Sequence, residues 1–462
     1  MTADRPCWCF LLPFTAFASL IALASCSAVP GEPGNTDCGN GVREPGEQCE
    51  GADLGGQTCE GLGLGSGALS CTSCLFDTSG CSNCGNGVCD PAESRTSCPA
   101  DCGVRKIAAG EYHACAAMGD GTLWCWGGNS KGTLGNGTFD PSPVPVPVPG
   151  IDGVVDLCAA MIHTCALLTD GTLWCWGGYN GMGLLGDGTE NQSPVPVQVT
   201  GVSDGTSVSC GSEHTCVLTT GGTVRCWGNN YYGQLGDGNM GQNSLIPVPV
   251  TSLADVADLA VGGGQSCASR TDGTAWCWGE GGTLGNVESQ AQPSDVPLQV
   301  DVLDDVRAMA RCAGSSSSIC AIRSDTSLWC WGRNLEGNVG DGTYDNLVIA
   351  PVQTLGLTDI VSAATGHEHT CASTTSGVAF CWGCMGSPNQ FGQLGSGSTE
   401  GSATAVQVVD LDSVVSVSAG GFFSCAVRED GSAWCWGNNY SGELGVGDEP
   451  QQSSLPLQVA FP

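Results

Sequence analysis

Residues 163–177 read HTCALLTDGTLWCWG, and this stretch decides how most of the chain folds. Cys165 and Cys175 stand ten residues apart, on either side of the triplet Thr169-Asp-Gly171. A three-residue hairpin loop needs a positive φ at its last position, which glycine adopts without strain. Residues directly opposite each other in such a hairpin have the Cα separation that a disulfide tolerates. The stretch therefore predicts an antiparallel β-hairpin closed by a disulfide.

The same unit occurs seven times. The tryptophan of its Cys-Trp-Gly segment recurs in steps of 50 to 54 residues, at Trp126, Trp176, Trp227, Trp278, Trp331, Trp382 and Trp436. The paired cysteines predict seven disulfides: Cys115–Cys125, Cys165–Cys175, Cys216–Cys226, Cys267–Cys277, Cys320–Cys330, Cys371–Cys381 and Cys425–Cys435. Repeats of this length, each too small to bury its own apolar face, predict an all-β, seven-bladed β-propeller over residues 104–462.

Each repeat predicts four short strands. In chain order these are a Pro-Val-x-Val strand such as 194–199, an apolar strand such as 154–160, and the two strands of the hairpin. In this order the first unit lacks a Pro-Val-x-Val strand, while the chain ends with a spare one at 455–459. We therefore expect the last strand to complete the first blade as a clasp. Proline is acceptable there because an outermost strand leaves one edge unpaired.

Other residues also recur at fixed repeat positions. Four histidines share one position, for which we expect a structural hydrogen bond to a neighbouring loop rather than a metal site: His113, His163, His214 and His369. The tryptophans two residues before the Cys-Trp-Gly set offer either packing or an exposed aromatic binding surface: Trp124, Trp174, Trp276, Trp329 and Trp434. Four propeller cysteines are left over, Cys158, Cys210, Cys312 and Cys384, and a bridge between the first two is left open.

The N-terminus is typical of an exported lipoprotein. An apolar run at 8–24 ends in Leu23-Ala24-Ser25-Cys26, which resembles the bacterial lipobox, so residues 1–25 are a predicted signal peptide and Cys26 the predicted lipid attachment site. Residues 26–37 then read as a flexible tether. The alternatives are a signal peptide of the ordinary secreted type and a transmembrane anchor, for which the run is short.

Residues 38–103 contain little aliphatic material and many cysteines. They divide into a first module at 38–81 and a second at 82–103, each opening with the sequence CGNGV. Domains this small need covalent links, so we expect a loop-rich stalk held by disulfides. The region resembles cysteine-rich repeats that act as spacers in surface proteins of some bacteria. Its aspartates leave calcium binding open.

Composition excludes several classes of function. The 31 cysteines are mostly spread out, which favours disulfides in an oxidising compartment over zinc sites. The net charge of −33 disfavours nucleic acid as a partner. No catalytic triad, paired-carboxylate motif or phosphate loop stands at a usable spacing. We therefore expect no enzyme activity, no catalytic residues, no cofactor and no metal.

The repeats resemble those of the regulator of chromosome condensation family, also called BNR-type repeats. Its glycine-rich motif appears here as Trp227-Gly-Asn-Asn-Tyr-Tyr-Gly-Gln-Leu-Gly-Asp-Gly238. The resemblance implies a propeller, and its eukaryotic namesake is an exchange factor for a small GTPase. Secreted bacterial relatives include a propeller that inhibits β-lactamases by covering their active site.

We therefore expect a monomeric interaction protein, held at the outer membrane or cell surface by its lipid anchor, or else secreted. Its ligand would be a protein or a glycan. The first alternative is an inhibitor that covers a target enzyme's active site, and the second is nucleotide exchange as the family alone implies.

Overall fold

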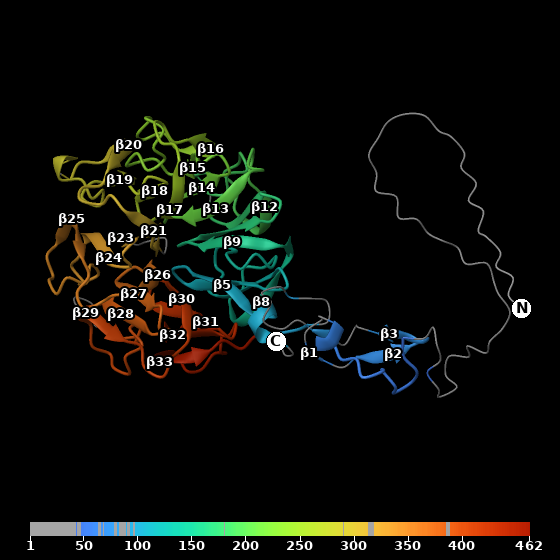
Figure 1. The fold of residues 1–462 in the computed structure, drawn as a ribbon. Helices are drawn as coiled ribbons and strands as arrows, with labels where there is room; N and C mark the ends of the chain where they lie inside the picture. The colour runs from blue at the N-terminus through green and yellow to red at the C-terminus, as the bar shows by residue number, and fades with distance from the viewer. Residues whose placement is uncertain are drawn as a thin grey trace, which may run out of the picture.

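The structure, a computed structural model, describes residues 43, 48–62, 66–67, 69–77, 81–82, 89, 93–95, 98–179, 181–289, 291–312, 318–384 and 389–462. It is an all-β, seven-bladed propeller preceded by a cysteine-rich region (Figure 1). The predicted signal peptide, the tether and Cys26 lie outside the described residues. Within the described residues, no helix has the length and apolarity that crossing a bilayer requires.

In the described part of the cysteine-rich region, the elements are all short. These are η1 (Glu60–Leu62), β1 (Ser66–Gly67), β2 (Ser70–Thr72), β3 (Leu75–Asp77), β4 (Cys81–Ser82) and α1 (Pro99–Cys102). Its described disulfides include Cys49–Cys71, Cys59–Cys81 and Cys89–Cys102. The last of these ties α1 back to the preceding chain, and β5 of the propeller begins directly afterwards, at Val104.

The first four blades follow in chain order. Blade 1 is β5 (Val104–Ala109), β6 (His113–Met118), β7 (Thr122–Gly127) and β8 (Ser142–Asp152). Blade 2 is β9 (Val154–Ala159), β10 (His163–Leu168), β11 (Leu173–Gly177) and β12 (Ser193–Gln198). Blade 3 is β13 (Gly205–Cys210), β14 (His214–Thr219), β15 (Val224–Gly228) and β16 (Ser244–Pro249). Blade 4 is β17 (Val256–Val261), β18 (Gln265–Arg270), β19 (Ala275–Gly279) and β20 (Ser294–Gln299), with the short helix η2 (Val287–Ser289) before its last strand.

The last three blades complete the ring. Blade 5 is β21 (Val306–Met309), β23 (Ser318–Arg323), β24 (Leu328–Arg333) and β25 (Leu347–Gln353). Blade 6 is β26 (Ile360–Thr365), β27 (His369–Thr374), β28 (Ala379–Gly383) and β29 (Ser402–Gln407). Blade 7 is β30 (Val414–Ala419), β31 (Phe423–Arg428), β32 (Ala433–Asn438) and β33 (Gln452–Gln458). The two-residue strand β22 (Arg311–Cys312) leaves blade 5 and pairs in parallel with β26 of blade 6.

The predicted clasp is wrong. Each Pro-Val-x-Val strand pairs with the Cys-Trp-Gly strand that precedes it in the chain, so β8 completes blade 1 and β33 completes blade 7. Blades 1 and 7 instead meet side by side (Figure 1). Main-chain bonds join them, including Val104 N–H to the Gly431 carbonyl, and Phe461 near the C-terminus packs edge-on against Trp126 of blade 1. The physical reason is connection length, because the chain leaving the third strand reaches its own blade's outer edge first.

All seven predicted hairpin cysteine pairs are disulfide-bonded, and their Cα atoms lie 4.1 Å apart. Each pair stands directly opposite in register, as Cys165 and Cys175 do between β10 and β11. A further bridge, Cys158–Cys210, joins the innermost strands of blades 2 and 3. Among the described residues, Cys312 and Cys384 are free thiols.

The seams between blades are built around the seven Cys-Trp-Gly tryptophans, which are fully buried. Each indole N–H donates to a main-chain carbonyl in the preceding blade at 2.8 to 3.0 Å. Trp176 thus bonds to Thr133 of blade 1, and Trp126 closes the circle by bonding to Glu443 of blade 7. The apolar clusters lie between neighbouring blades, with residues of both in each. The apolar core of this protein is therefore divided among the seven interfaces between neighbouring blades, which we call seams.

The four repeat histidines reinforce these seams. Their Nε2 atoms lie 2.7 to 2.9 Å from a hydroxyl on the second strand of the next blade, in the pairs His113–Thr164, His163–Thr215, His214–Ser266 and His369–Ser424. The partner is a strand hydroxyl rather than the neighbouring loop that the sequence suggested. The Thr164 hydroxyl in turn donates to the Thr133 carbonyl that Trp176 also uses. The histidines therefore have a structural role.

One glycine in each blade allows the seam to close, and the loop of blade 3 provides a matched test. A Cβ on Gly236 would lie 2.7 Å from Nε1 of Trp278, whereas a Cβ on Gly238 would meet nothing within 4 Å. Both have positive φ, 69° and 80°. We expect Gly238→Ala to cost about 1 kcal/mol of stability through backbone strain. Gly236→Ala should cost about 2–4 kcal/mol because overpacking is added. Equal costs in denaturant unfolding would contradict this account of the seam.

The buried histidines also predict acid sensitivity. Burial lowers the pKa of His113, His214 and His369 to about 3 and that of His163 to about 4. Below pH 6.5 the histidines of the unfolded chain therefore bind protons that those of the folded chain do not. As the pH is lowered, the free energy of unfolding decreases by up to about 1.4 kcal/mol per pH unit for each histidine. We expect His214→Gln to reduce the slope of stability against pH between about pH 6 and 4, as measured by urea unfolding. The exposed His367 serves as control, and an equal effect of His367→Gln would refute the assignment.

Candidate functional site

The antiparallel order of the strands gives the propeller two different faces. The connections between first and second strands, and between third and fourth strands, emerge on the same side of every blade. We call this side the loop face; in blade 1 it consists of residues 110–112 and 128–141. The tight hairpin loops, such as residues 169–171, lie on the opposite face. Long connections of varied sequence on a rigid ring are where binding residues are usually found.

A band of large side chains crosses the loop face; its members are aromatic in blades 6, 7 and 1, and it ends at Met161 in blade 2. Edge-to-face contacts link its first part, with ring centres 5.6 Å apart for His367–Phe422 and Phe391–Phe422, and 6.0 Å apart for Phe391–Tyr440. The band continues around a pocket into the next two blades. We define the aromatic band as His367, Phe391, Phe422, Tyr440, Tyr112, Phe139 and Met161.

The pocket in this band has a volume of about 430 Å³. Tyr440 of blade 7, Tyr112 and Phe139 of blade 1, and Met161 of blade 2 line it. Their exposed fractions are 63%, 43%, 43% and 39%, so large apolar side chains face solvent together here. Clustered exposed aromatic residues of this kind mark interaction surfaces rather than ordinary protein surface.

Two buried acidic side chains accompany the band. Glu111 is 4% exposed and Glu443 is completely buried, and Glu443 accepts bonds from the Asn438 amide and the Ser441 N–H, both at 2.8 Å. Burial, followed by the charges of Glu111 and Glu443, raises the pKa of Tyr112. The aromatic pocket therefore has two buried acidic side chains near its Tyr112 wall, while the exposed Lys131 is the charged residue of its lining.

The half-buried tryptophans do not form the exposed aromatic surface that the sequence offered as one alternative. Trp124, Trp174, Trp276, Trp329 and Trp434 are half-buried, and each donates its indole N–H to a threonine or serine hydroxyl two residues earlier, at 3.0 to 3.2 Å. Trp124 also packs against the apolar cluster between blades 7 and 1. These tryptophans stabilise the blades through packing and hydrogen bonds. The exposed aromatic residues of the band lie instead in the connections between strands.

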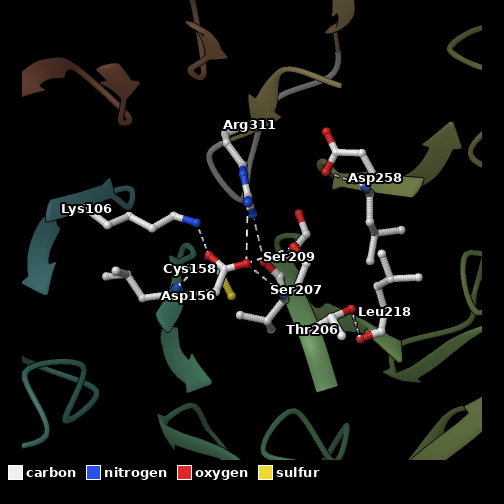
Figure 2. A network of polar contacts seen from close by, with 12 residues as sticks. Lys106, Asp156, Cys158, Thr206, Ser207, Ser209, Leu218, Asp258 and Arg311 are labelled. Atoms are coloured by element: carbon white, nitrogen blue, oxygen red, sulfur yellow. Dashed lines mark hydrogen bonds and ion pairs between the residues drawn. The ribbon is translucent and has the colours of Figure 1, made fainter. Parts of the chain in front are cut away.

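A polar network connects the innermost strands at the centre of the ring (Figure 2). Asp156 on β9 is 3% exposed and accepts from the Leu157 and Val208 N–H groups at 2.8 and 3.0 Å and from the Ser207 hydroxyl at 2.8 Å. Lys106 of blade 1 pairs with its Oδ1. Arg311 reaches its Oδ2 at 3.4 Å and also donates to the Val208 carbonyl at 3.0 Å.

Arg311 can span the centre because β22 has left blade 5. Burial raises the pKa of Asp156, but Arg311 and Lys106 outweigh burial and lower it to about 2, so the carboxyl group stays ionised. Its oxygens are occupied by five donors from blades 1, 2, 3 and β22. We therefore interpret this network as a structural plug and the loop face as the candidate binding site.

Sequence reasoning did not identify either the aromatic band or the plug. Tyr112 and Phe422 share the repeat position directly before the histidine position, and Met161 and His367 share the position before that. Residue types at these two positions differ from blade to blade, so no periodic motif marks the band. Lys106, Asp156, Ser207 and Asp258 do share one position of the innermost strand, and an alignment of those strands would have pointed to the centre. The departure of β22 from its blade has no such signal.

Comparison with known proteins supports this fold. The model of the RCC1-like domain matches residues 153–461, and models of the regulator of chromosome condensation (RCC1) repeat match 104–133 and 120–167. The ultraviolet-B receptor UVR8 of Arabidopsis thaliana is 31% identical over 61% of this chain and 64% of the receptor. The human E3 ubiquitin-protein ligase HERC2 is 30% identical over 52% of this chain and 5% of the ligase. The chain thus spans less than two thirds of these curated relatives.

Solved structures show the same fold. Prp20p from Saccharomyces cerevisiae, described with its binding to Gsp1p and histones, aligns with a TM-score of 0.60 and 24% identity over 71% of this chain and 83% of its own. Human WBSCR16 aligns with a TM-score of 0.62 and 20% identity over 74% and 94%. Since the RCC1-like model covers well over half of the residues, the chain belongs to the family of RCC1-like domain proteins.

Proposed function

We propose that this protein is an exported, lipid-anchored and non-catalytic interaction protein that binds a partner protein through its loop face. The observation that carries the proposal is the aromatic band, which presents large apolar side chains from four neighbouring blades on one side of a rigid ring. Aromatic residues at this density supply most of the binding energy in protein interfaces. A role in protein binding also agrees with what is described for the structurally similar Prp20p, which binds Gsp1p and histones.

The proposed setting follows from cysteine chemistry. Seven hairpin disulfides and one bridge between blades require an oxidising compartment to form and persist. A lipid at Cys26 would hold the propeller at the membrane surface at the end of the tether and the cysteine-rich region. We favour a protein over a glycan as partner because the exposed rings are set in a broad band rather than a narrow cleft. An inhibitor that covers a target enzyme would use the same face.

Binding by the loop face is tested by site-specific photocrosslinking in the native envelope. We expect a photoreactive phenylalanine at Tyr440 or Phe139 to form a discrete crosslinked product with a partner protein. The same probe at Val415, at the opposite end of β30 and 49% exposed, is the control. Purified Tyr112→Ala/Tyr440→Ala protein should compete at least tenfold less well than wild type, because truncating two interface aromatic residues typically costs well over 1 kcal/mol. Crosslinking from Val415 alone would reject the loop face.

Lipid anchoring is tested separately. We expect labelled palmitate to be incorporated into the wild-type protein and to be lost in Cys26→Ala, because the diacylglycerol is attached to that thiol. The Cys9→Ala variant changes another cysteine of the N-terminal stretch and should keep the label. Intact mass and fractionation of membranes from soluble protein provide the measurement. Equal labelling of both variants would disprove attachment at Cys26.

A further inference from the structure

The pocket of the aromatic band has a chemistry of its own. Tyr112, Phe139 and Tyr440 present aromatic rings around a single hollow of about 430 Å³, with Met161 completing the wall. The volume greatly exceeds that of one bound water and suits a long side chain. The faces of aromatic rings carry partial negative charge and attract cations that lie over them.

Two acidic side chains near the pocket also favour a positively charged ligand. Glu111 has one oxygen 3.5 Å from Nδ1 of His367 in the band, and Glu443 accepts bonds from Asn438 and Ser441, which flank Tyr440 in the chain. Burial is the main cause of the raised pKa of Tyr112, and the charges of Glu111 and Glu443 raise it further. Lys131 is the one residue of the pocket lining with a permanent charge, and its exposure leaves its ammonium group free to turn toward solvent.

The chain as a whole attracts the same kind of partner. It carries 46 acidic against 13 basic residues, and a net charge of this sign raises the encounter rate with positively charged surfaces. The net charge of the chain and the aromatic lining of the pocket therefore favour the same kind of ligand, a positively charged group. A neutral apolar group would gain from the rings alone, whereas a cationic side chain with an apolar stem gains from the rings and from the carboxylates.

We propose that the pocket of Tyr112, Phe139 and Tyr440 receives the side chain of an arginine or lysine presented by the partner protein. This inference rests on the proposed function, because it assigns the central contact of the loop face. The stem of the inserted side chain would lie along Met161 and the rings, and its charged group would lie over the ring faces, toward Glu111 and Glu443. The partner surface around it would carry net positive charge.

The test uses two small peptides that differ only in charge. The probes are N-acetyl-Gly-Arg-Gly-amide and the same peptide with citrulline, the neutral isostere of arginine, titrated into the folded protein and followed by NMR shifts. We expect the arginine peptide to bind at least about fivefold more tightly in low salt, which is the size of one partly desolvated cation–aromatic contact. The preference should shrink at 0.5 M NaCl because screening weakens the contribution of the carboxylates.

Variants separate the two parts of the site. Glu111→Gln should reduce the arginine preference without weakening the citrulline peptide, and Tyr440→Ala should weaken both. Val415→Ala on the opposite face is the control and should change neither, while thermal melts check that each variant is folded. Equal affinity for the two peptides, or no shift with either at 10 mM, would overturn the inference. If photocrosslinking from Tyr440 still captures a partner in that case, the proposed function stands and only the cationic contact is wrong.

Discussion

The ring depends on one contact between blades: the indole N–H of a buried tryptophan donates to a main-chain carbonyl of the preceding blade. A blade of four short strands buries too little surface to stand alone, so its stability comes from its two neighbours. A glycine packs against each indole, as Gly236 does against Trp278. Because it has no side chain, the loop that contains it can come close to the tryptophan of the next blade. Seven such contacts close a circle without an exchanged strand.

The hairpin disulfides and the seams have different tasks. A disulfide between residues ten apart fixes two strands within one blade and leaves the ring itself unconstrained. The connection between blades comes from the tryptophans, the histidines and, for blades 2 and 3, the Cys158–Cys210 bridge. The plug around Asp156 adds a tie through the centre, from blade 1 to β22. These contacts make the propeller rigid. Its binding surface is therefore already ordered before a partner arrives, which lowers the entropic cost of binding.

The histidines illustrate how much of the seam is written in the sequence. Their shared position pointed to a structural role, and the residue one before the next blade's cysteine supplies the hydroxyl partner, as in His163–Thr215. Where Phe423 replaces histidine, the next blade has Ala114 rather than a hydroxyl residue. The pairing is therefore readable from the repeats, but only once neighbouring blades are known to present these strands to each other.

The sequence by itself determined the number of blades, the hairpin register and the seven cysteine pairs, because period and spacing are local properties that repeat. It did not determine which strand completes each blade, since a Pro-Val-x-Val segment pairs equally well with either neighbour until connection lengths decide. Tertiary structure alone placed β22 beside β26 and brought Arg311 to Asp156. It also assembled the aromatic band, because its residues come from connections in four different blades, and only the closed ring brings these connections together on one face.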